Sequence, residues 1–303
     1  MSNTFLLCCH FLRCYPIKDS ISISETDCVV QLQPLLDHTA TRIVENCKET
    51  IIFFANKMNN KHIDLEMVKK YGYDGSGGFT EFKQKFINTG DSDSHVFLTT
   101  MVPLRLLNNK NILWDNPKPS SVIYCRPVRL QMVKETSEVI KNEYNRMSQQ
   151  IDELIPLQYK FDEYSINIKF SVHFTMVDGK VINTITGTSS AQRCYLCGIT
   201  SAAFNRLEKN TNDDDDFLHF GMSSLHSWIR VFECLIHIAY RLEFKIWKKS
   251  GNEELYESAK QRIQRDFFSK IGIHVDKPRS NYGSSNDGNT ARLFFKMPKL
   301  LLK

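Results

Sequence analysis

Two aspartates, each followed by glycine, stand where predicted strands end and are the first candidates for chemistry. Asp74 lies in the segment Tyr71–Gly78, and Asp178 follows a long segment of alternating residues. Carboxylates on one rigid sheet are hard oxygen ligands of the kind Mg²⁺ prefers, and two such ions can activate a nucleophile and stabilise a leaving oxygen in phosphoryl transfer. Asp-Gly is also a strong turn signal, so a hairpin role for both residues stays open.

A second candidate is the C-x-x-C motif of Cys194 and Cys197, with Gly198 directly after it. This spacing is typical of a knuckle that gives two thiolates to a tetrahedral Zn²⁺, which needs two further ligands. No second C-x-x-C motif follows, and the remaining candidates are His219, His226, Cys234 and His237. Two free thiols or a redox dithiol are the alternatives, and we favour zinc.

The elements that must position these groups follow from hydrophobic periodicity. Helical spacing predicts a helix over residues 28–58 and a shorter one around Ile63, Met67 and Val68. Alternation predicts strands over 71–78, 95–107, 122–133 and 164–176, and an apolar stripe predicts a helix over 136–154. A β-β-β-α-β order can place its first and fourth strands side by side, which would bring Asp74 and Asp178 together.

Composition limits the classes of protein that fit. The 303 residues are 42% apolar and 24% charged, which excludes chain-wide disorder, collagen and coiled coil. The apolar runs are too short to span a membrane, and nine cysteines without a disulfide framework indicate a reducing compartment. Residues 225–303 carry 15 Lys and Arg against 8 Asp and Glu. This basic third fits a polyanion such as nucleic acid, although solvated helix faces would explain it as well.

Several motifs in this order resemble those of Transib transposases, whose superfamily includes the catalytic subunit of the V(D)J recombinase. The resemblance runs from about residue 30 to the C-terminus. The segments that carry it are Tyr73–Gly78, Lys83–Phe86, Met101–Leu106, Cys125–Leu130, Lys134–Thr136, Leu225–Arg230 and Ser285–Arg292.

The resemblance implies a DDE-type DNA recombinase with an RNase H-like mixed sheet. In such enzymes Mg²⁺ or Mn²⁺, here on Asp74 and Asp178, activates water to nick DNA, and the freed 3′-hydroxyl attacks the opposite strand. It also implies that Cys194 and Cys197 are half of a Zn²⁺ site in an insertion domain. The implied partners are transposon terminal repeats and a second copy of the chain, and the implied location is nuclear. Glu135 is an auxiliary candidate for the metals, although an acid at a helix start is favourable in any case.

We therefore expect an α/β protein in three parts. Residues 1–70 form a helical DNA-binding or dimerisation segment, 71–190 the RNase H-like catalytic core, and 191–303 an incomplete, mainly helical zinc-binding insertion domain. In the family, the His-x-x-x-x-His pair and the third acid follow the segment that corresponds to Ser285–Arg292. This sequence contains neither of them. We expect a C-terminally truncated chain with little cleavage activity alone. The alternatives are a non-catalytic DNA-binding protein and a zinc-dependent interaction module.

Overall fold

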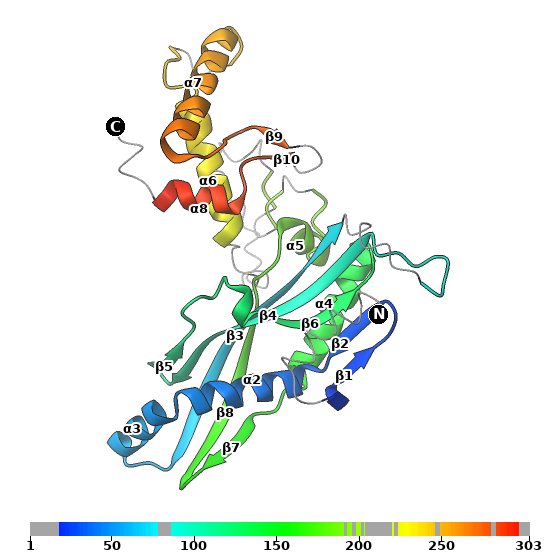
Figure 1. Ribbon diagram of the computed structural model, residues 1–303, viewed down its shortest axis with the longest axis vertical. Helices are drawn as coiled ribbons and strands as arrows, with labels where there is room; N and C mark the ends of the chain where they lie inside the picture. Colours follow the sequence, from blue (N-terminus) through cyan, green and yellow to red (C-terminus); the bar gives the residue numbers. More distant parts are fainter. Residues whose placement is uncertain are drawn as a thin grey trace. The chain divides into compact units, whose positions relative to one another are not determined.

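The computed structural model describes most of the chain and divides it into two compact units, residues 1–221 and 222–303. The described residues are 18–77, 86–190, 193–195, 198–200, 203, 220, 224–245, 249–279 and 283–296. The first unit is mixed α/β, and the described part of the second is mainly helical (Figure 1). The helical segment expected over 1–70 and the core expected over 71–190 both belong to the first unit.

One curled, mixed sheet forms the centre of the first unit. Its elements are η1 (Lys18–Ser20), β1 (Ile21–Ile23), β2 (Asp27–Val30), α2 (Leu32–Asn46), α3 (Lys48–Met58), β3 (His62–Gly77), β4 (His95–Asn108), β5 (Asn111–Asp115), η3 (Val122–Tyr124), β6 (Arg126–Gln131), α4 (Ser137–Asp152), β7 (Leu157–Phe161), β8 (Tyr164–Phe174) and α5 (Gly179–Ile185). The strand order is β1-β2-β6-β4-β3-β8-β7, with β5 paired to β4. Strand β3 is antiparallel to β4 and parallel to β8, which confirms that the first and fourth strands of the predicted β-β-β-α-β order are neighbours.

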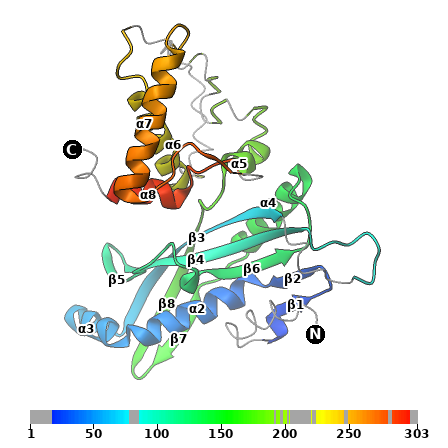
Figure 2. The same ribbon diagram turned by 45° about the horizontal axis from the view of Figure 1, so that its top comes forward.

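Helices cover one face of this sheet, and the first half of β3 alternates between residues buried on that face and exposed residues. Ile63, Leu65 and Met67 are buried against α2 and α3, and Tyr71 and Tyr73 are buried in the cluster that includes α4. The residues between them in the first half of the strand are exposed. Figure 2 shows α2 running along the sheet. The helices α2, α3 and α4 therefore form a layer that packs against β3.

The helix predicted around Ile63, Met67 and Val68 is wrong, because these residues lie within β3. Positions four apart share a face in a strand as well as in a helix, so the spacing of Ile63 and Met67 satisfied both periods. The predicted helix over 28–58 is confirmed from Leu32 onward, with a break at Cys47 between α2 and α3, but residues 27–30 form β2.

The strands predicted around β4 and β8 and the helix predicted as α4 are confirmed. Helix α4 begins after Thr136, whose side chain accepts a hydrogen bond from the Val139 amide and so caps the helix. The strand predicted over 122–133 is confirmed in part, because residues 122–124 form η3 and the strand β6 begins at Arg126. The hairpin strand β7 was not predicted.

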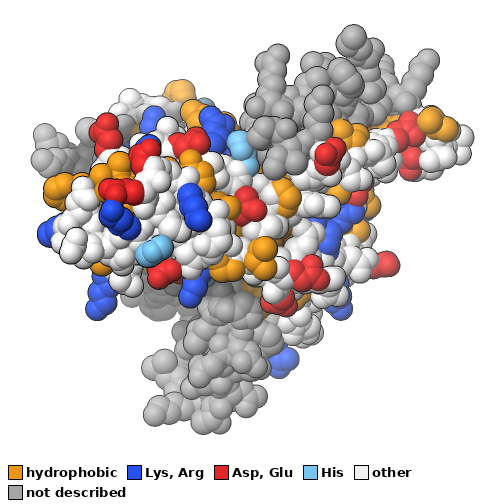
Figure 3. All heavy atoms as spheres, turned by 90° about the horizontal axis from the view of Figure 1, so that it is seen from below, with side chains coloured by type: hydrophobic (Ala, Val, Ile, Leu, Met, Phe, Trp, Pro, Cys, Tyr) orange, Lys and Arg blue, Asp and Glu red, His pale blue; other side chains and the backbone are white. Residues whose placement is uncertain are grey.

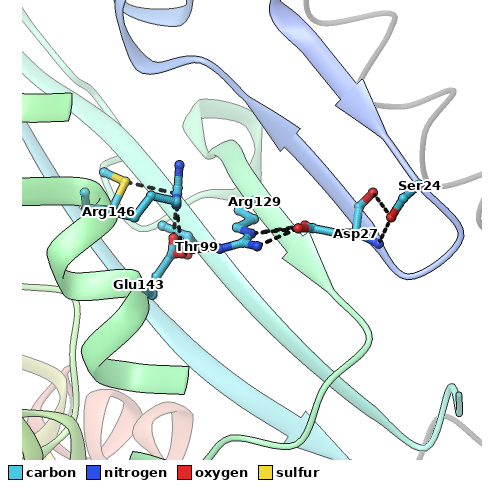
Figure 4. A network of polar contacts seen from close by, with 7 residues as sticks. Ser24, Asp27, Thr99, Arg129, Glu143 and Arg146 are labelled. Atoms are coloured by element: carbon cyan, nitrogen blue, oxygen red, sulfur yellow. Dashed lines mark hydrogen bonds and ion pairs between the residues drawn. The ribbon is translucent and has the colours of Figure 1, made fainter. Parts of the chain in front are cut away.

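A buried ionic network ties α4 to the sheet (Figure 4). The Glu143 side chain is 1% exposed, and its Oε1 accepts hydrogen bonds from Thr99 and from Arg146 at 2.5 and 2.6 Å. Its Oε2 accepts from Arg129 at 3.0 Å, and Arg129 also makes a bidentate contact with Asp27. One carboxylate thereby connects α4 to β4 and β6 directly and, through Arg129, to β2.

The second unit packs helices α6 (Ser224–Ala239), α7 (Glu253–Ile271) and α8 (Gly288–Lys296) around an apolar cluster, with a hairpin of β9 (Pro278–Arg279) and β10 (Gly283–Ser284). Residues of the segment Ser285–Arg292 make hydrogen bonds within this unit. Asn286 exchanges hydrogen bonds with Asp276, and the Asp287 carboxylate accepts from the Thr290 amide at the start of α8. Among the helices described, none combines the length and the apolar character that a membrane span requires.

Replacing Glu143 by Gln should destabilise the first unit by about 3 kcal/mol, because it leaves two arginines without their shared charge. Burial alone would raise the pKa of Glu143, but hydrogen bonds and charge from Arg146, Thr99 and Arg129 hold that pKa below its ordinary value. The wild type should therefore lose stability as the pH falls below the ordinary glutamate pKa of about 4.3. Urea unfolding at pH 7 and at pH 3 measures both effects.

The matched control is Glu153→Gln, on an exposed residue at the end of the same helix. Its unfolding free energy should stay within about 0.5 kcal/mol of wild type. A Glu143→Gln variant as stable as this control at pH 7 would contradict the structural role of the network.

Candidate functional site

Asp74 lies within strand β3 and not in a hairpin turn. It pairs with Leu98 of β4, and the β3–β4 ladder continues to the pair of Gly77 and His95. Its neighbour Tyr73 is buried and packs its ring against Phe97 and Phe174, at centroid distances of 5.4 and 5.2 Å. Asp74 itself is exposed. The backbone on either side of the carboxylate is thus fixed by the ladder and by the aromatic core.

The chain leaving β8 passes unusually close to β3 at Gly72. The β3–β8 ladder ends at Tyr71 and Phe174, and the amides of Thr175 and Met176 both donate to the Tyr71 carbonyl, at 3.1 and 3.0 Å. A Cβ placed on Gly72 would lie 1.9 Å from the Met176 carbonyl oxygen. Only glycine permits this approach.

This approach places Asp74 and Asp178 at the same end of the sheet. Each aspartate follows the contact by two residues, Asp74 after Gly72 and Asp178 after Met176. Asp178 is the N-cap of α5, where its Oδ1 accepts a hydrogen bond from the Val181 amide at 2.9 Å. The hairpin alternative is therefore wrong for both residues, since one lies in a ladder and the other caps a helix.

Glu135 lies against the same end of β3, immediately beyond Asp74. A Cβ on Gly75 would be 2.5 Å from the Glu135 Cβ, so this side chain packs directly on the glycine backbone. The Glu135 side chain is 13% exposed, and Lys180 Nζ of α5 lies 3.0 Å from its Oε1 without hydrogen-bond geometry. Residue 135 precedes the cap of α4 and does not open the helix.

The donor chemistry at this end of the sheet suits a hard divalent cation. Asp74, Asp178 and Glu135 all offer carboxylate oxygens, and the buried Oε1 of Glu135 already has an ammonium group beside it. Within the described ranges, however, no three His, Cys, Asp or Glu side chains stand close enough together to hold a metal ion. The three carboxylates come from neighbouring segments at this end of the sheet and do not form a closed ligand set.

Cys194, the first cysteine of the C-x-x-C motif, makes two backbone hydrogen bonds. Its carbonyl accepts from the Gly198 amide and its amide donates to Ile199, both at 2.9 Å, and Gly198 has a φ of +69° that favours glycine. Cys197 and His219 lie outside the described residues, as does the side chain of His226. His237 lies 3.5 Å from Asp276, and Cys234 is exposed on α6. Zinc binding by Cys194 and Cys197 stays a prediction.

An open groove lies between the start of α4 and α5. It has a volume of about 380 Å³. Its lining residues are Ser137, Lys141, Lys180, Asn183, Thr184, Gly187, Thr188, Ser189 and Ser190. Sequence reasoning missed both the groove and Lys180, because a lysine just inside a short helix carries no signal in a single sequence.

Comparison with models of known protein families gives no match for this chain, and comparison with curated proteins gives none. The chemical assignment of the site therefore rests on its own residues. These are the carboxylates at the end of β3 and β8, the lysine beside them and the adjoining polar groove.

Replacing Gly72 by Ala should destabilise the first unit by about 2–3 kcal/mol, because the new methyl group overlaps the Met176 carbonyl and must force β8 and β3 apart. The matched control is Gly77→Ala on the same strand, where the nearest atom to the new Cβ would be at an ordinary 3.6 Å. Urea unfolding of the two variants measures the difference. Equal stability of both variants would contradict the close approach.

Proposed function

We propose that this chain is a DDE-type DNA transposase or recombinase relative whose RNase H-like core consists of β3, β4, β6, α4 and β8. The observation that carries the proposal is the convergence of Asp74 and Asp178 at one end of two adjacent parallel strands. The position of Glu135 against Gly75, between the third strand and the helix, adds a third carboxylate to that end. Carboxylates that hold divalent cations serve phosphoryl transfer, and the resemblance to Transib transposases supplies DNA as the substrate.

Asp74 and Asp178 would hold Mg²⁺ or Mn²⁺, with Glu135 as an auxiliary ligand. When bound, these ions supply an activated water and stabilise charge on the phosphate that is attacked. The chain's own contribution is rigidity: the ladder fixes the backbone of Asp74, and the N-cap bond of Asp178 uses one of its two carboxylate oxygens and fixes the residue's direction. Lys180 makes an ion pair with Glu135.

A non-catalytic DNA-binding protein is the second candidate. It is favoured by the absence of a three-ligand cluster among the described side chains. On the face drawn in Figure 3, basic and acidic side chains are interspersed, so that face offers no extended basic surface to DNA. Transposon terminal repeats as the DNA, a second copy as partner and a nuclear location belong to both proposals.

The two candidates differ in how a divalent cation affects DNA binding. If the carboxylates hold the cation next to a phosphate, Mn²⁺ should tighten binding of a DNA duplex about tenfold, within the usual range of coupling between two ligands. Asp74→Asn and Asp178→Asn should each abolish this gain, and asparagine at 178 still caps α5. Fluorescence anisotropy with the full chain, in Mn²⁺ and in EDTA, measures it.

The matched control is Asp64→Asn, on an exposed residue of β3 ten positions before Asp74. This variant should keep the full response to Mn²⁺. DNA affinity that is the same with and without Mn²⁺, or the same in all three variants, would favour the non-catalytic protein and would remove the catalytic proposal.

We also propose that Cys194 and Cys197 bind Zn²⁺. The purified chain should then contain about one zinc ion, and Cys194→Ser should lose most of it because a thiolate ligand is removed. Elemental analysis after gel filtration measures the content, with Cys234→Ser as the control for an exposed thiol. Zinc content that is zero in the wild type, or unchanged in Cys194→Ser, would sink the zinc assignment.

A further inference from the structure

The groove between α4 and α5 differs in charge from the carboxylates beside it. Both of its charged lining residues, Lys141 and Lys180, are basic, and none of the described residues that line it is acidic. Asn183, Ser137 and Ser189 add neutral polar groups that can donate hydrogen bonds. Such a surface suits an anion with several acceptor oxygens.

Lys180 links this groove to the carboxylates. Its ammonium group lies 3.0 Å from Glu135 Oε1, and it also lines the groove. Asp178 begins the same helix two residues earlier. An anion in the groove would therefore be separated from the carboxylate end of the sheet by a single side chain.

Of the two lysines that line the groove, Lys141 is the one whose charge is available to an anion. It is exposed one turn into α4, and it makes no ion pair within the ranges that the structure describes. Lys180, in contrast, is partly neutralised by Glu135. The Thr184 hydroxyl donates back to the Lys180 carbonyl at 2.9 Å, so it contributes to the wall of the groove and not to its set of donors.

We propose that this groove binds a backbone phosphate of DNA, adjacent to the phosphate held at the carboxylates. The inference rests on the proposed function and deepens it by giving the path of one strand. A lysine contacts phosphate as a point charge and reads no base, so the groove would position the strand without selecting its sequence. The open shape of the groove and its continuity with the carboxylates favour a polymer backbone over a small enclosed phosphate ester.

The test is the salt dependence of DNA binding by the full chain. Each lost phosphate contact lowers the slope of log affinity against log salt by about 0.9 on duplex DNA. Lys141→Gln should therefore flatten the slope by about that amount and weaken binding several-fold at low salt. Anisotropy titrations of a duplex of about 30 base pairs, from roughly 50 to 200 mM KCl, measure both the slope and the affinity.

The matched control is Lys160→Gln, on an exposed residue of the edge strand β7, which should keep the wild-type slope. Lys180→Gln should also flatten the slope. A Lys141→Gln slope equal to that of the control would overturn the groove proposal, and so would weaker binding with an unchanged slope. These outcomes are independent of the Mn²⁺ response of Asp74→Asn and Asp178→Asn, so failure of the groove and failure of the proposed function are distinguishable.

Discussion

The packing of the Gly72 backbone against the Met176 carbonyl is the constraint on which the candidate site depends. It lets the chain leaving β8 continue along β3 after the ladder has ended, where a side chain would push it away. The path of the chain from β8 to Asp178 and α5 follows from it. Asp178 caps α5 beside the strand that carries Asp74, and α5 then brings Lys180 to Glu135. A carboxylate pair is positioned here by a backbone contact, before any side-chain interaction contributes.

A second constraint acts through α4. Glu135 precedes this helix, so its position against Gly75 depends on where the helix lies on the sheet. The helix is held by apolar packing of Ile140 and Met147 and by the Glu143 network, which reaches three strands. A buried carboxylate is tolerated only when its oxygens are fully paired, and Glu143 has charged or hydroxyl partners on both oxygens. The ionic network thus sets the geometry of a residue eight positions away in sequence.

The sequence predicted the strands that lead to the carboxylates better than the elements that support those strands. Strand β8 was predictable because one face of it is buried over many residues, and the β-β-β-α-β order followed from the elements around it. The first half of β3 was not, since Ile63 and Met67 fit both periods and only pairing with β4 and β8 decides between them. Lys69 is another obstacle: it is 1% exposed in β3, and burial lowers the pKa of its amine well below the ordinary value. A lysine is expected at the surface until the fold that buries it is known.

Two of the carboxylates at this end of the sheet contact a group that stabilises negative charge. Asp178 accepts one hydrogen bond at the N-terminus of α5, and Glu135 makes an ion pair with the Lys180 ammonium group. Each is weaker than the field of a divalent cation at the same distance, which acts on every carboxylate nearby. The Lys180 side chain is flexible and 56% exposed, so a phosphate at the proposed groove site would compete with Glu135 for its ammonium group. A cation at the proposed carboxylate site and a phosphate at the proposed groove site would therefore act on the same ion pair, that of Lys180 and Glu135.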